Sequence, residues 1–374
     1  MSDSMTKTTA PAKSADIGRG YIGLTPRATT LSDESYLEYV QTFRKMITQD
    51  MFPIVESVGE AQYEAWKAEH KPNANTDDLD DIKREFRKAP VTLAWQRFLR
   101  SQQEMLWRRT RDSFVRNGKE ILEKIQTAES QGPGKLIYSD DFKVPAYTRQ
   151  EIHLQPGGFT DDPLGGVVFH YGTMVFYEGI NDQDELYKEL AELTVLPEGK
   201  CDRVLDVACA IGQGTMALKE LYPDVEVTGL DVGLPLIKYG HYRAVERGLD
   251  VTFTQGLAED MPYDDGHFDA ILSYLLYHEV AEDKIEEIVQ EIYRVLRPGG
   301  VFTIFDFPNN YGETLAPAYR FLIDFDSRNN CEPYSVGFVH CDFLGILRRA
   351  GFEVSEGPKA SNPFLQPILA KKPL

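Results

Sequence analysis

The second half of the chain alternates between two hydrophobic patterns. Short apolar runs of strand length occur at five places, separated by stretches in which apolar residues recur at helical spacing. Strands alternating with helices predict right-handed crossovers and a parallel sheet with helices on both faces. The predicted strands are Arg203–Val207, Glu226–Leu230, Val251–Thr254, Phe268–Ser273 and Val301–Phe305, and the predicted helices are Gly214–Leu221, Pro235–Arg247 and Asp283–Leu296.

The C-terminal end has a different pattern. A helix is expected at Asp342–Ala350, followed by two strands at Phe352–Ser355 and Phe364–Ala370 that form an antiparallel hairpin at a sheet edge. Together these elements predict an α/β fold with a doubly wound, mainly parallel, seven-stranded sheet of Rossmann-like type. This domain is expected to span residues 185–374, with a substrate insertion at about 308–340.

The first half of the chain is helical in period. Apolar residues from Tyr36 to Ile47 follow helical spacing after Ser32, which is a candidate N-cap, and a second helical region runs from Asp81 to Thr127 with interruptions near Pro90 and Gly118. We therefore expect a disordered leader over residues 1–30 and an all-helical domain over residues 31–130.

Residues 131–184 differ from both flanking regions in composition and in hydrophobic pattern. They are rich in glycine and aromatic residues and show no sustained helical period. Such a segment is typical of a structured loop, and we expect a linker and a lid over the neighbouring domain.

Composition narrows the range of partners. The net charge of −19 opposes binding to nucleic acid or to an anionic membrane, and no apolar run is long enough to span a bilayer.

The first residues lack the apolar core of a secretory signal, and the four cysteines have no zinc-like spacing. A cytoplasmic protein with reduced thiols is expected. His153, His170 and His278 match no standard metal site, so no metal is expected.

One segment opposes the acidic trend. Residues 83–119 hold eleven Lys or Arg against three Asp or Glu. Two interpretations stay open: a solvated helix face whose charges pair with acidic neighbours, or a surface for an acidic substrate or partner.

Candidate chemistry gathers where the predicted parallel strands end, which is where doubly wound sheets bind ligands. VLDVACAIGQGT (Val204–Thr215) contains Asp206 at the end of a strand and Gly212 at the start of a helix. Asp231 closes the next strand nineteen residues beyond Gly212. The segments GLAEDMP (Gly256–Pro262), SYLLYH (Ser273–His278) and LRPGG (Leu296–Gly300) follow in order.

In the order and spacing of these motifs, the region from Glu185 to Leu374 resembles the class I S-adenosylmethionine-dependent methyltransferases. The resemblance implies S-adenosyl-L-methionine as cofactor and S-adenosyl-L-homocysteine as product. It also implies a role for each matching position. Asp206 and the backbone of Ala208, Ala210 and Gly212 would hold the methionine part, and Asp231 the ribose hydroxyls. Val232, Ala258 and Glu259 would lie at the adenine, and Tyr274 near the sulfonium.

Two departures from the family pattern bear on this site. Ala208 and Ala210 stand where glycine is usual, which costs little provided that their φ angles are negative and a methyl group fits. Leu257 stands where an acid often accepts a hydrogen bond from adenine. Glu259, Asp260 or a water would then take its place, or adenine would bind more weakly.

Methyl transfer requires alignment of the acceptor with the sulfonium and, for an alcohol, removal of a proton. His278, after the fourth strand, is a candidate proton acceptor or substrate contact, with a structural histidine as the alternative. His170 and Tyr171 in the lid are the other catalytic candidates. The candidates for substrate binding are Tyr147, Phe159, Tyr177, Tyr277 and Arg320. Arg320 and Arg328 have two open interpretations: they hold a substrate carboxylate, or they pair with Asp324 or Asp326.

These observations favour a methyltransferase that acts on an oxygen or sulfur atom of a small molecule. A protein or RNA methyltransferase using the basic helix of residues 83–119 is one alternative. A non-catalytic cofactor-binding or scaffold protein of the same fold is another. The N-terminal helices are a candidate surface for a homodimer.

Overall fold

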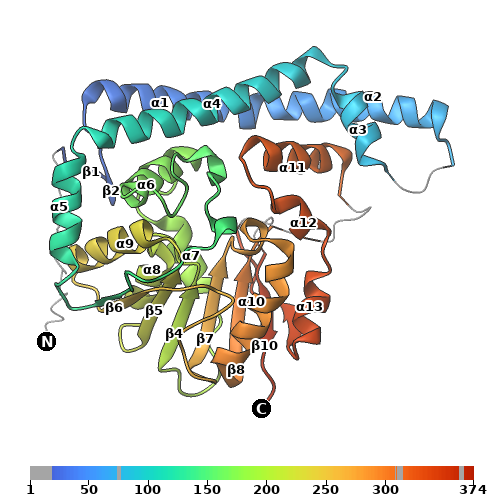
Figure 1. Ribbon diagram of the computed structural model, residues 1–374. Coiled ribbons are helices and arrows are strands. Elements are labelled where there is room, and N and C mark those ends of the chain that lie inside the picture. The colour runs from blue at the N-terminus through green and yellow to red at the C-terminus, as the bar shows by residue number, and fades with distance from the viewer. Residues whose placement is uncertain (1–18, 74–76, 308, 310–314, 362–365) are drawn as a thin grey trace, which may run out of the picture.

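The computed structural model describes residues 19–73, 77–307, 309, 315–361 and 366–374. In these residues eight strands form one sheet in the order β3-β6-β5-β4-β7-β8-β10-β9 (Figure 1). The strands from β3 to β8 are parallel, and β10 is antiparallel to both of its neighbours. Their bounds are β3 (Lys135–Ile137), β4 (Arg203–Val207), β5 (Glu226–Asp231), β6 (Val251–Gln255), β7 (Phe268–Tyr274), β8 (Leu296–Phe305), β9 (Glu353–Glu356) and β10 (Ile368–Lys371).

The predicted α/β class and mainly parallel sheet are confirmed, but the count of seven strands is wrong. The additional strand, β3, pairs with β6 at the edge of the sheet and comes from the segment expected to be a linker. Three residues are too few to show an alternating pattern in the sequence. Of the predicted last strand, Phe364 and Leu365 lie outside the described residues, Gln366 and Pro367 precede β10, and Ile368–Ala370 belong to it.

Helices cover both faces of the sheet, as alternating strands and helices predict. On one face α7 (Glu185–Leu193), α8 (Gln213–Leu221) and α9 (Leu234–Arg247) share a core with Val204, Phe253 and Leu272. On the other face α10 (Glu282–Val295) and α13 (Phe343–Arg349) share a core with Leu205, Ile271 and Phe302. Neighbouring residues of one strand therefore enter opposite cores, as the pleat requires.

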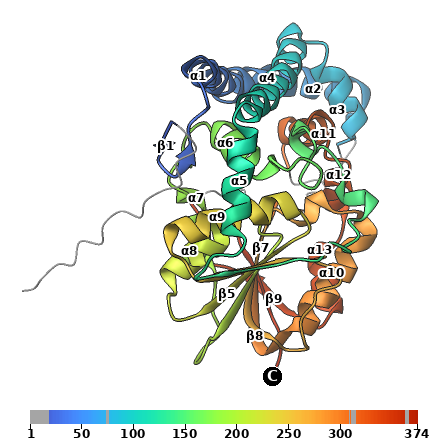
Figure 2. The same cartoon turned by 60° about the vertical axis from the view of Figure 1, so that its left-hand side comes forward.

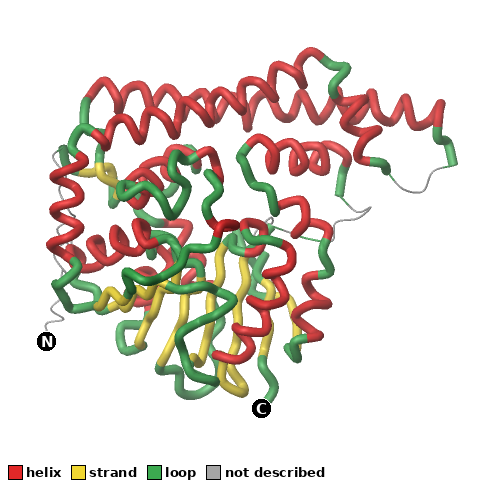
Figure 3. Tube along the Cα trace, viewed as in Figure 1, coloured by secondary structure: helices red, strands yellow, loops and turns green. Residues whose placement is uncertain are grey.

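A layer of long helices lies across the carboxyl ends of the strands (Figures 1 and 3). It contains α1 (Leu31–Lys45), η1 (Met46–Met51), α2 (Phe52–His70), α3 (Leu79–Phe86) and α4 (Pro90–Val115), and α5 (Gly118–Ala128) descends from it beside the sheet (Figure 2). The interruptions at Pro90 and Gly118 are confirmed. The N-cap of α1 is Thr30 and not Ser32, because the Thr30 side chain accepts the hydrogen bond from the Asp33 N–H.

Residues 19–30 are ordered, contrary to the expected leader. β1 (Tyr21–Ile22) and β2 (Thr25–Pro26) form a short hairpin, and Arg19 and Arg27 both form ion pairs with Glu34 of α1. Buried Thr25 and Ala28 further anchor this segment. Residues 1–18 of the expected leader lie outside the described residues.

The segment expected to be a lid without helical period contains a helix, α6 (Gly165–Phe176). Its glycines allow neighbouring side chains to approach the helix backbone. A Cβ atom at Gly172 would lie 2.0 Å from the Trp107 ring of α4, and one at Gly166 would lie 2.3 Å from Tyr239 of α9. Nearly the whole helix is buried, so its sequence shows no polar face, and for this reason the helical period was missed.

The insertion after β8 belongs to the helical layer. Its helix α11 (Pro317–Asn329) places Phe321 against Phe86 of α3 and Trp95 of α4, and a short α12 (Ser335–His340) follows. The segment of α11 and α12, from the C-terminal half of the chain, therefore helps the N-terminal helices to cover the carboxyl ends of the strands.

Most charges of the basic segment have acidic partners. Arg109 and Arg116 pair with Asp33, Arg111 pairs with Asp162, and Arg100 pairs with Glu104. This pairing favours the interpretation of a solvated, charge-paired face over a surface for an acidic partner. In the described part of the chain, no helix combines the length and the apolarity that crossing a membrane requires. A homodimer through these helices stays a prediction.

Candidate active site

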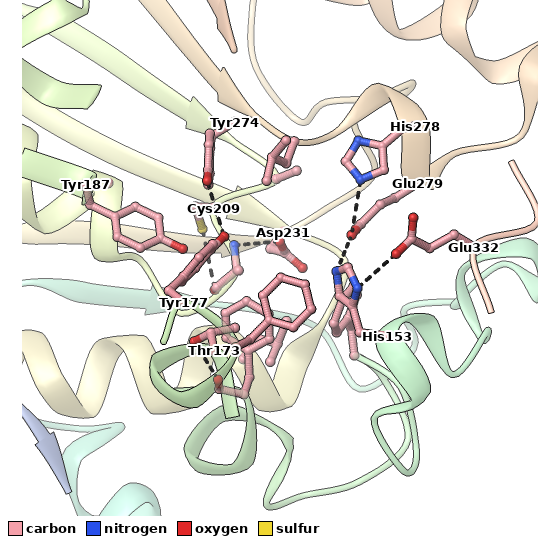
Figure 4. A pocket seen from close by; sticks show the side chains of 18 of the residues that line it. His153, Thr173, Tyr177, Tyr187, Cys209, Asp231, Tyr274, His278, Glu279 and Glu332 are labelled. Atoms are coloured by element: carbon pink, nitrogen blue, oxygen red, sulfur yellow. Dashed lines mark hydrogen bonds and ion pairs between the residues drawn. The ribbon is translucent and has the colours of Figure 1, made fainter. Parts of the chain in front are cut away.

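A cavity of about 260 Å³ lies between the strand ends and the helical layer (Figure 4). The cavity is at the topological switch point of the sheet, since β5 and β7 flank β4 and lead in opposite directions. Its walls come from distant parts of the chain. They include Asp206, Asp231 and Tyr274 at the strand ends, Phe169, Thr173 and Phe176 on α6, Trp107 on α4, and Asp326, Asn330 and Glu332 in or after α11.

The loop between β4 and α8 is the floor of this cavity. Ala208, Ala210 and Gly212 all have positive φ angles, of 58°, 47° and 72°. The condition under which alanine would cost little, a negative φ angle, is therefore not met: the loop keeps the backbone of a glycine loop although two glycines are absent. An alanine in this region costs ~1–2 kcal/mol, so the loop stores strain. Gly212 cannot be replaced in the same way, because a Cβ there would lie 2.3 Å from the Phe253 ring.

Asp231 holds this loop from the neighbouring strand. Its two carboxylate oxygens accept hydrogen bonds from the backbone N–H groups of Ala210 (2.8 Å) and Gly233 (2.7 Å). Burial raises its pKa to about 6, although both N–H groups act in the opposite direction. Each oxygen keeps a further lone pair, and Asp231 lines the cavity, so the carboxylate has the capacity to accept two more hydrogen bonds from a diol.

Asp206 is the second buried acid of the floor. Its Oδ2 accepts a hydrogen bond from Thr215 Oγ1 (2.8 Å), and burial raises its pKa to about 7. The contacts of the described residues include no cation beside it. A ligand ammonium group would supply the missing counter-charge and lower the pKa.

A smaller cavity of about 80 Å³ adjoins the first, and both are lined by Phe159, Ala208, Asp231 and Glu279. It also contains three of the positions expected at the adenine, Val232, Ala258 and Glu259, together with Leu257 and Tyr147. Tyr147 donates a hydrogen bond to Glu259 Oε1 (2.5 Å), so this oxygen of Glu259 already has a partner within the protein. Whether Glu259 also replaces the missing acid at Leu257 stays a prediction.

Tyrosine side chains form one wall beside the floor. The hydroxyl groups of Tyr177 and Tyr274 lie 3.2 Å apart, and the ring of Tyr187 packs edge-on against Tyr274. In Figure 4 these three tyrosines lie on one side of Asp231, and a group of imidazoles and carboxylates lies on the other. The cavity therefore has two ends of different chemistry.

His278 lies at the second end. Its Nδ1 is 2.7 Å from Asp306 Oδ1, and its Nε2 is 3.9 Å from Glu279 Oε1, beyond hydrogen-bond distance. Burial lowers the pKa of His278, but the charge and hydrogen bond of Asp306 outweigh burial and raise it to about 9. Asp306 is fixed in turn by the N–H groups of Tyr277 and Phe307. This arrangement is an oriented imidazole with one nitrogen directed at the cavity.

His153 forms a second imidazole–carboxylate group in the same cavity. Its Nδ1 lies 2.9 Å from Glu332 Oε1, and its Nε2 lies 3.3 Å from the same Glu279 oxygen that faces His278. Burial lowers the pKa of His153, but the charges and hydrogen bonds of Glu332 and Glu279 raise it to about 10. His153 is therefore an imidazolium ion at neutral pH.

Two expected catalytic residues lie elsewhere. On α6, Phe169, Thr173 and Phe176 face the cavity, so His170 and Tyr171 point to other sides of the helix. His170 Nδ1 is 2.9 Å from the Tyr239 hydroxyl, and Tyr171 packs edge-on against Phe114. Burial lowers the pKa of His170 well below its usual value. Their positions do not fit the expected catalytic role.

Two expected substrate contacts are also displaced from the cavity. Tyr277 is fully buried between Phe338 and Phe343, because the turn after β7 directs His278 and Tyr277 to opposite sides. Arg320 donates a hydrogen bond to the backbone oxygen of Asp77, and Arg328 pairs with Asp324. Phe159 and Tyr177 line the main cavity and Tyr147 lines the smaller one, so these three keep a position compatible with substrate binding.

Sequence reasoning missed the carboxylates at the second end of the cavity. Asp306 could have been predicted from the sequence, because it directly follows β8, which is parallel to β7, the strand that leads to His278. No local pattern in the sequence indicates the other members of this group, because their proximity depends on how the insertion packs; they are Glu279, Asp326, Asn330 and Glu332. Among the described residues, no three or more His, Cys, Asp or Glu side chains are grouped so as to hold a metal ion.

Comparison with known proteins finds similar methyltransferases. A family model described as a methyltransferase domain matches residues 204–300. An uncharacterized methyltransferase from Synechocystis sp. is 30% identical over 184 residues, which cover 49% of this chain and 80% of that protein. A solved S-adenosylmethionine-dependent methyltransferase from Methanosarcina mazei has 20% identity over 47% of this chain and 94% of its own, with a TM-score of 0.36.

Two further relatives have named activities. A fatty-acid O-methyltransferase from Mycolicibacterium smegmatis is 30% identical over 50% of this chain and 64% of its own length. A demethylmenaquinone methyltransferase from Thermus thermophilus is 37% identical over 28% of this chain and 47% of its own length. This chain thus spans less than two thirds of either relative.

The sheet order and the acids at the strand ends define an α/β fold of the kind that binds ligands at the switch point. With the matches above, the chain belongs to the class I S-adenosylmethionine-dependent methyltransferases. Its residues fit the cofactor that this family uses. Asp231 has lone pairs free for the ribose hydroxyls, Asp206 is a buried acid without a cation, and the smaller cavity adjoins both.

Proposed function

We propose that this enzyme methylates a hydroxyl oxygen of a small, largely apolar molecule, and that His278 accepts the proton of that hydroxyl group. The observation that carries the proposal is the His278–Asp306 pair, which lines the same cavity as the cofactor loop. An oxygen acceptor of this kind benefits from a positioned base, whereas a thiolate or carboxylate acceptor needs none.

When bound, S-adenosylmethionine supplies an electrophilic methyl group on a sulfonium ion, which the acceptor oxygen attacks in line. Asp306 holds the Nδ1–H of His278, so that Nε2 can accept the hydroxyl proton. With a pKa of about 9, His278 is a base strong enough for a phenolic or enolic hydroxyl. Only the neutral imidazole accepts a proton, so turnover should rise with pH towards this value.

The remaining walls support an apolar acceptor body. Trp107, Phe159, Phe169, Phe176 and Phe307 line the cavity, and aromatic surfaces bind flat or chain-like apolar groups. The named relatives act, by their names, on a fatty acid and on demethylmenaquinone, both small molecules with a large apolar part. The acidic charge of the chain and the paired arginines of α4 make an RNA acceptor a weaker candidate.

A sulfur acceptor and a non-catalytic role are the competing functions. A thiol needs little help from a base at neutral pH, so the His278–Asp306 pair would have no task. A scaffold protein would have no use for two oriented imidazoles in a cavity with the cofactor floor.

The test is methyl transfer from S-adenosylmethionine carrying a labelled methyl group to a panel of phenols, fatty acids and thiols. We expect label on phenolic oxygen, and at least a hundredfold loss of kcat in His278→Gln with S-adenosylhomocysteine affinity nearly unchanged. Transfer to a thiol or a fatty acid alone, at the same rate in the variant, would contradict the proposal.

A further inference from the structure

The acceptor end of the cavity has a marked bias in charge. Glu279, Asp326 and Glu332 line it, and Asp306 lies directly behind His278. The only cations among the described lining residues are the two histidines, because no lysine or arginine lines the cavity. Two of these carboxylates already hold the imidazoles, so the surplus of acceptor oxygens faces the space available to the substrate.

The geometry around His153 concentrates this surplus at one place. His153 links Glu332 of the insertion to Glu279 of the short helix after β7 (η4, Tyr277–Glu279), and its backbone oxygen accepts a hydrogen bond from Gln103 of α4 (3.2 Å). Three distant segments are thereby fixed around one corner of the cavity. Thr173 and Asn330 also line the cavity, beside the carboxylates that supply the acceptor oxygens of this end.

From this arrangement we infer that the corner formed by His153, Glu332 and Asp326 binds a second polar group of the acceptor, a hydrogen-bond donor such as a hydroxyl or ammonium group, and excludes a carboxylate. The inference rests on the proposed function and deepens it by naming the substrate class: an apolar hydroxylated molecule with a further donor group. These residues therefore determine specificity, whereas His278 acts at the methylated oxygen.

The physical basis is the cost of burying like charges together. A substrate carboxylate at this corner would face Glu332 and Asp326, and the cation of the corner, His153, is already paired with Glu332 and Glu279. No lysine or arginine lines the cavity to pair with such a carboxylate, and buried charges are tolerated only when they are paired. A donor group instead donates hydrogen bonds to carboxylate oxygens, each of which can accept more than one. Burial and the charge of Glu332 raise the pKa of Asp326 to about 6 against the opposing charges of Arg44 and His153, which is the direction that an excess of carboxylates predicts.

Three phenols with a common ring and different side-chain ends test the inference: tyramine (ammonium), tyrosol (hydroxyl) and para-hydroxyphenylacetate (carboxylate). Their affinities are measured by calorimetry at neutral pH with the full chain saturated with S-adenosylhomocysteine, and their methylation is measured in parallel. We expect tyramine and tyrosol to bind at least tenfold more tightly than para-hydroxyphenylacetate.

Glu332→Gln keeps the shape of the corner and removes one charge. It should reduce the preference for tyramine over para-hydroxyphenylacetate at least threefold, whereas exposed Glu286→Gln on α10 should leave the preference as in the wild type. Equal or tighter binding of para-hydroxyphenylacetate, or binding of none of the three phenols, would overturn the inference and leave the cofactor site standing. Absence of S-adenosylhomocysteine binding would instead overturn the proposed function, and this inference with it.

Discussion

The two ends of the cavity are built in different ways. The cofactor end consists of residues at the ends of neighbouring parallel strands, each within a few positions of a predicted strand boundary. The acceptor end combines His278, Glu279 and Asp306, which follow β7 and β8, with side chains from α4, α6, the segment before α6 and the insertion after β8. The sheet register therefore fixes the first end, whereas the second end is completed only by the packing of the helical layer.

This difference suggests a division of labour. The strand ends provide a cofactor site whose parts are set by the fold, while the helical layer can change without disturbing the sheet. Substitutions at the two ends should consequently have separable effects. Those at the acceptor end should alter turnover or substrate choice, and those at the cofactor end should alter cofactor affinity.

The largest expected effect is at the acceptor end, on turnover. His278→Gln should lower kcat at least a hundredfold, because positioned proton transfer typically contributes 10²–10⁴-fold. Labelled methyl transfer measures the rate, and calorimetry with S-adenosylhomocysteine should give an affinity close to that of the wild type. His170→Gln is the matched control: it removes a buried histidine outside the cavity and should lower thermal stability with kcat per folded enzyme retained. Equal losses of kcat in both variants would contradict the assignment.

The next effect concerns the cofactor end. Asp231→Ala should weaken S-adenosylhomocysteine binding tenfold or more, about 1.4 kcal/mol, because it removes the acceptor for the ribose hydroxyls and releases the N–H groups of Ala210 and Gly233. Exposed Asp224→Ala provides a control of the same chemistry. An affinity that is the same in both variants would mean that the cofactor does not use the end of β5.

The smallest effect tests the strained loop. Ala210→Gly should raise the free energy of unfolding by up to about 1 kcal/mol, because glycine adopts the positive φ angle without the ~1–2 kcal/mol strain but gains more freedom in the unfolded chain. Ala61→Gly, at an exposed position within α2, should lower it by about 1 kcal/mol. Chemical denaturation compares the two. A loss of stability in both variants would show that the φ angle at Ala210 carries no strain.

The sequence predicted the cofactor end well, because period, strand ends and motif spacing are local signals. Arg203–Val207 is a strand with the predicted bounds, and Asp206, Asp231 and Tyr274 line the expected cavity. It failed for α6, since a fully buried helix has no polar face and its glycines resembled those of a loop. As a result, the sequence points to His170 and Tyr171 as cavity residues of this segment, whereas Phe169 and Thr173 line the cavity in the structure. Glu332 could not be predicted, because its distance from His153 depends on the docking of the insertion.

The pH dependence of kcat/KM, compared between the wild type and Asp306→Asn, tests the central claim that the His278–Asp306 pair removes a proton from the acceptor. Because only neutral His278 accepts a proton, kcat/KM for the wild type should rise with pH and level off above about 9. In Asp306→Asn, burial acts without the opposing carboxylate, so the inflection should shift to lower pH and the plateau should fall. The ionisation of the acceptor itself is common to both profiles. Two profiles with the same inflection, or a wild-type profile that is flat from neutral to alkaline pH, would contradict the account.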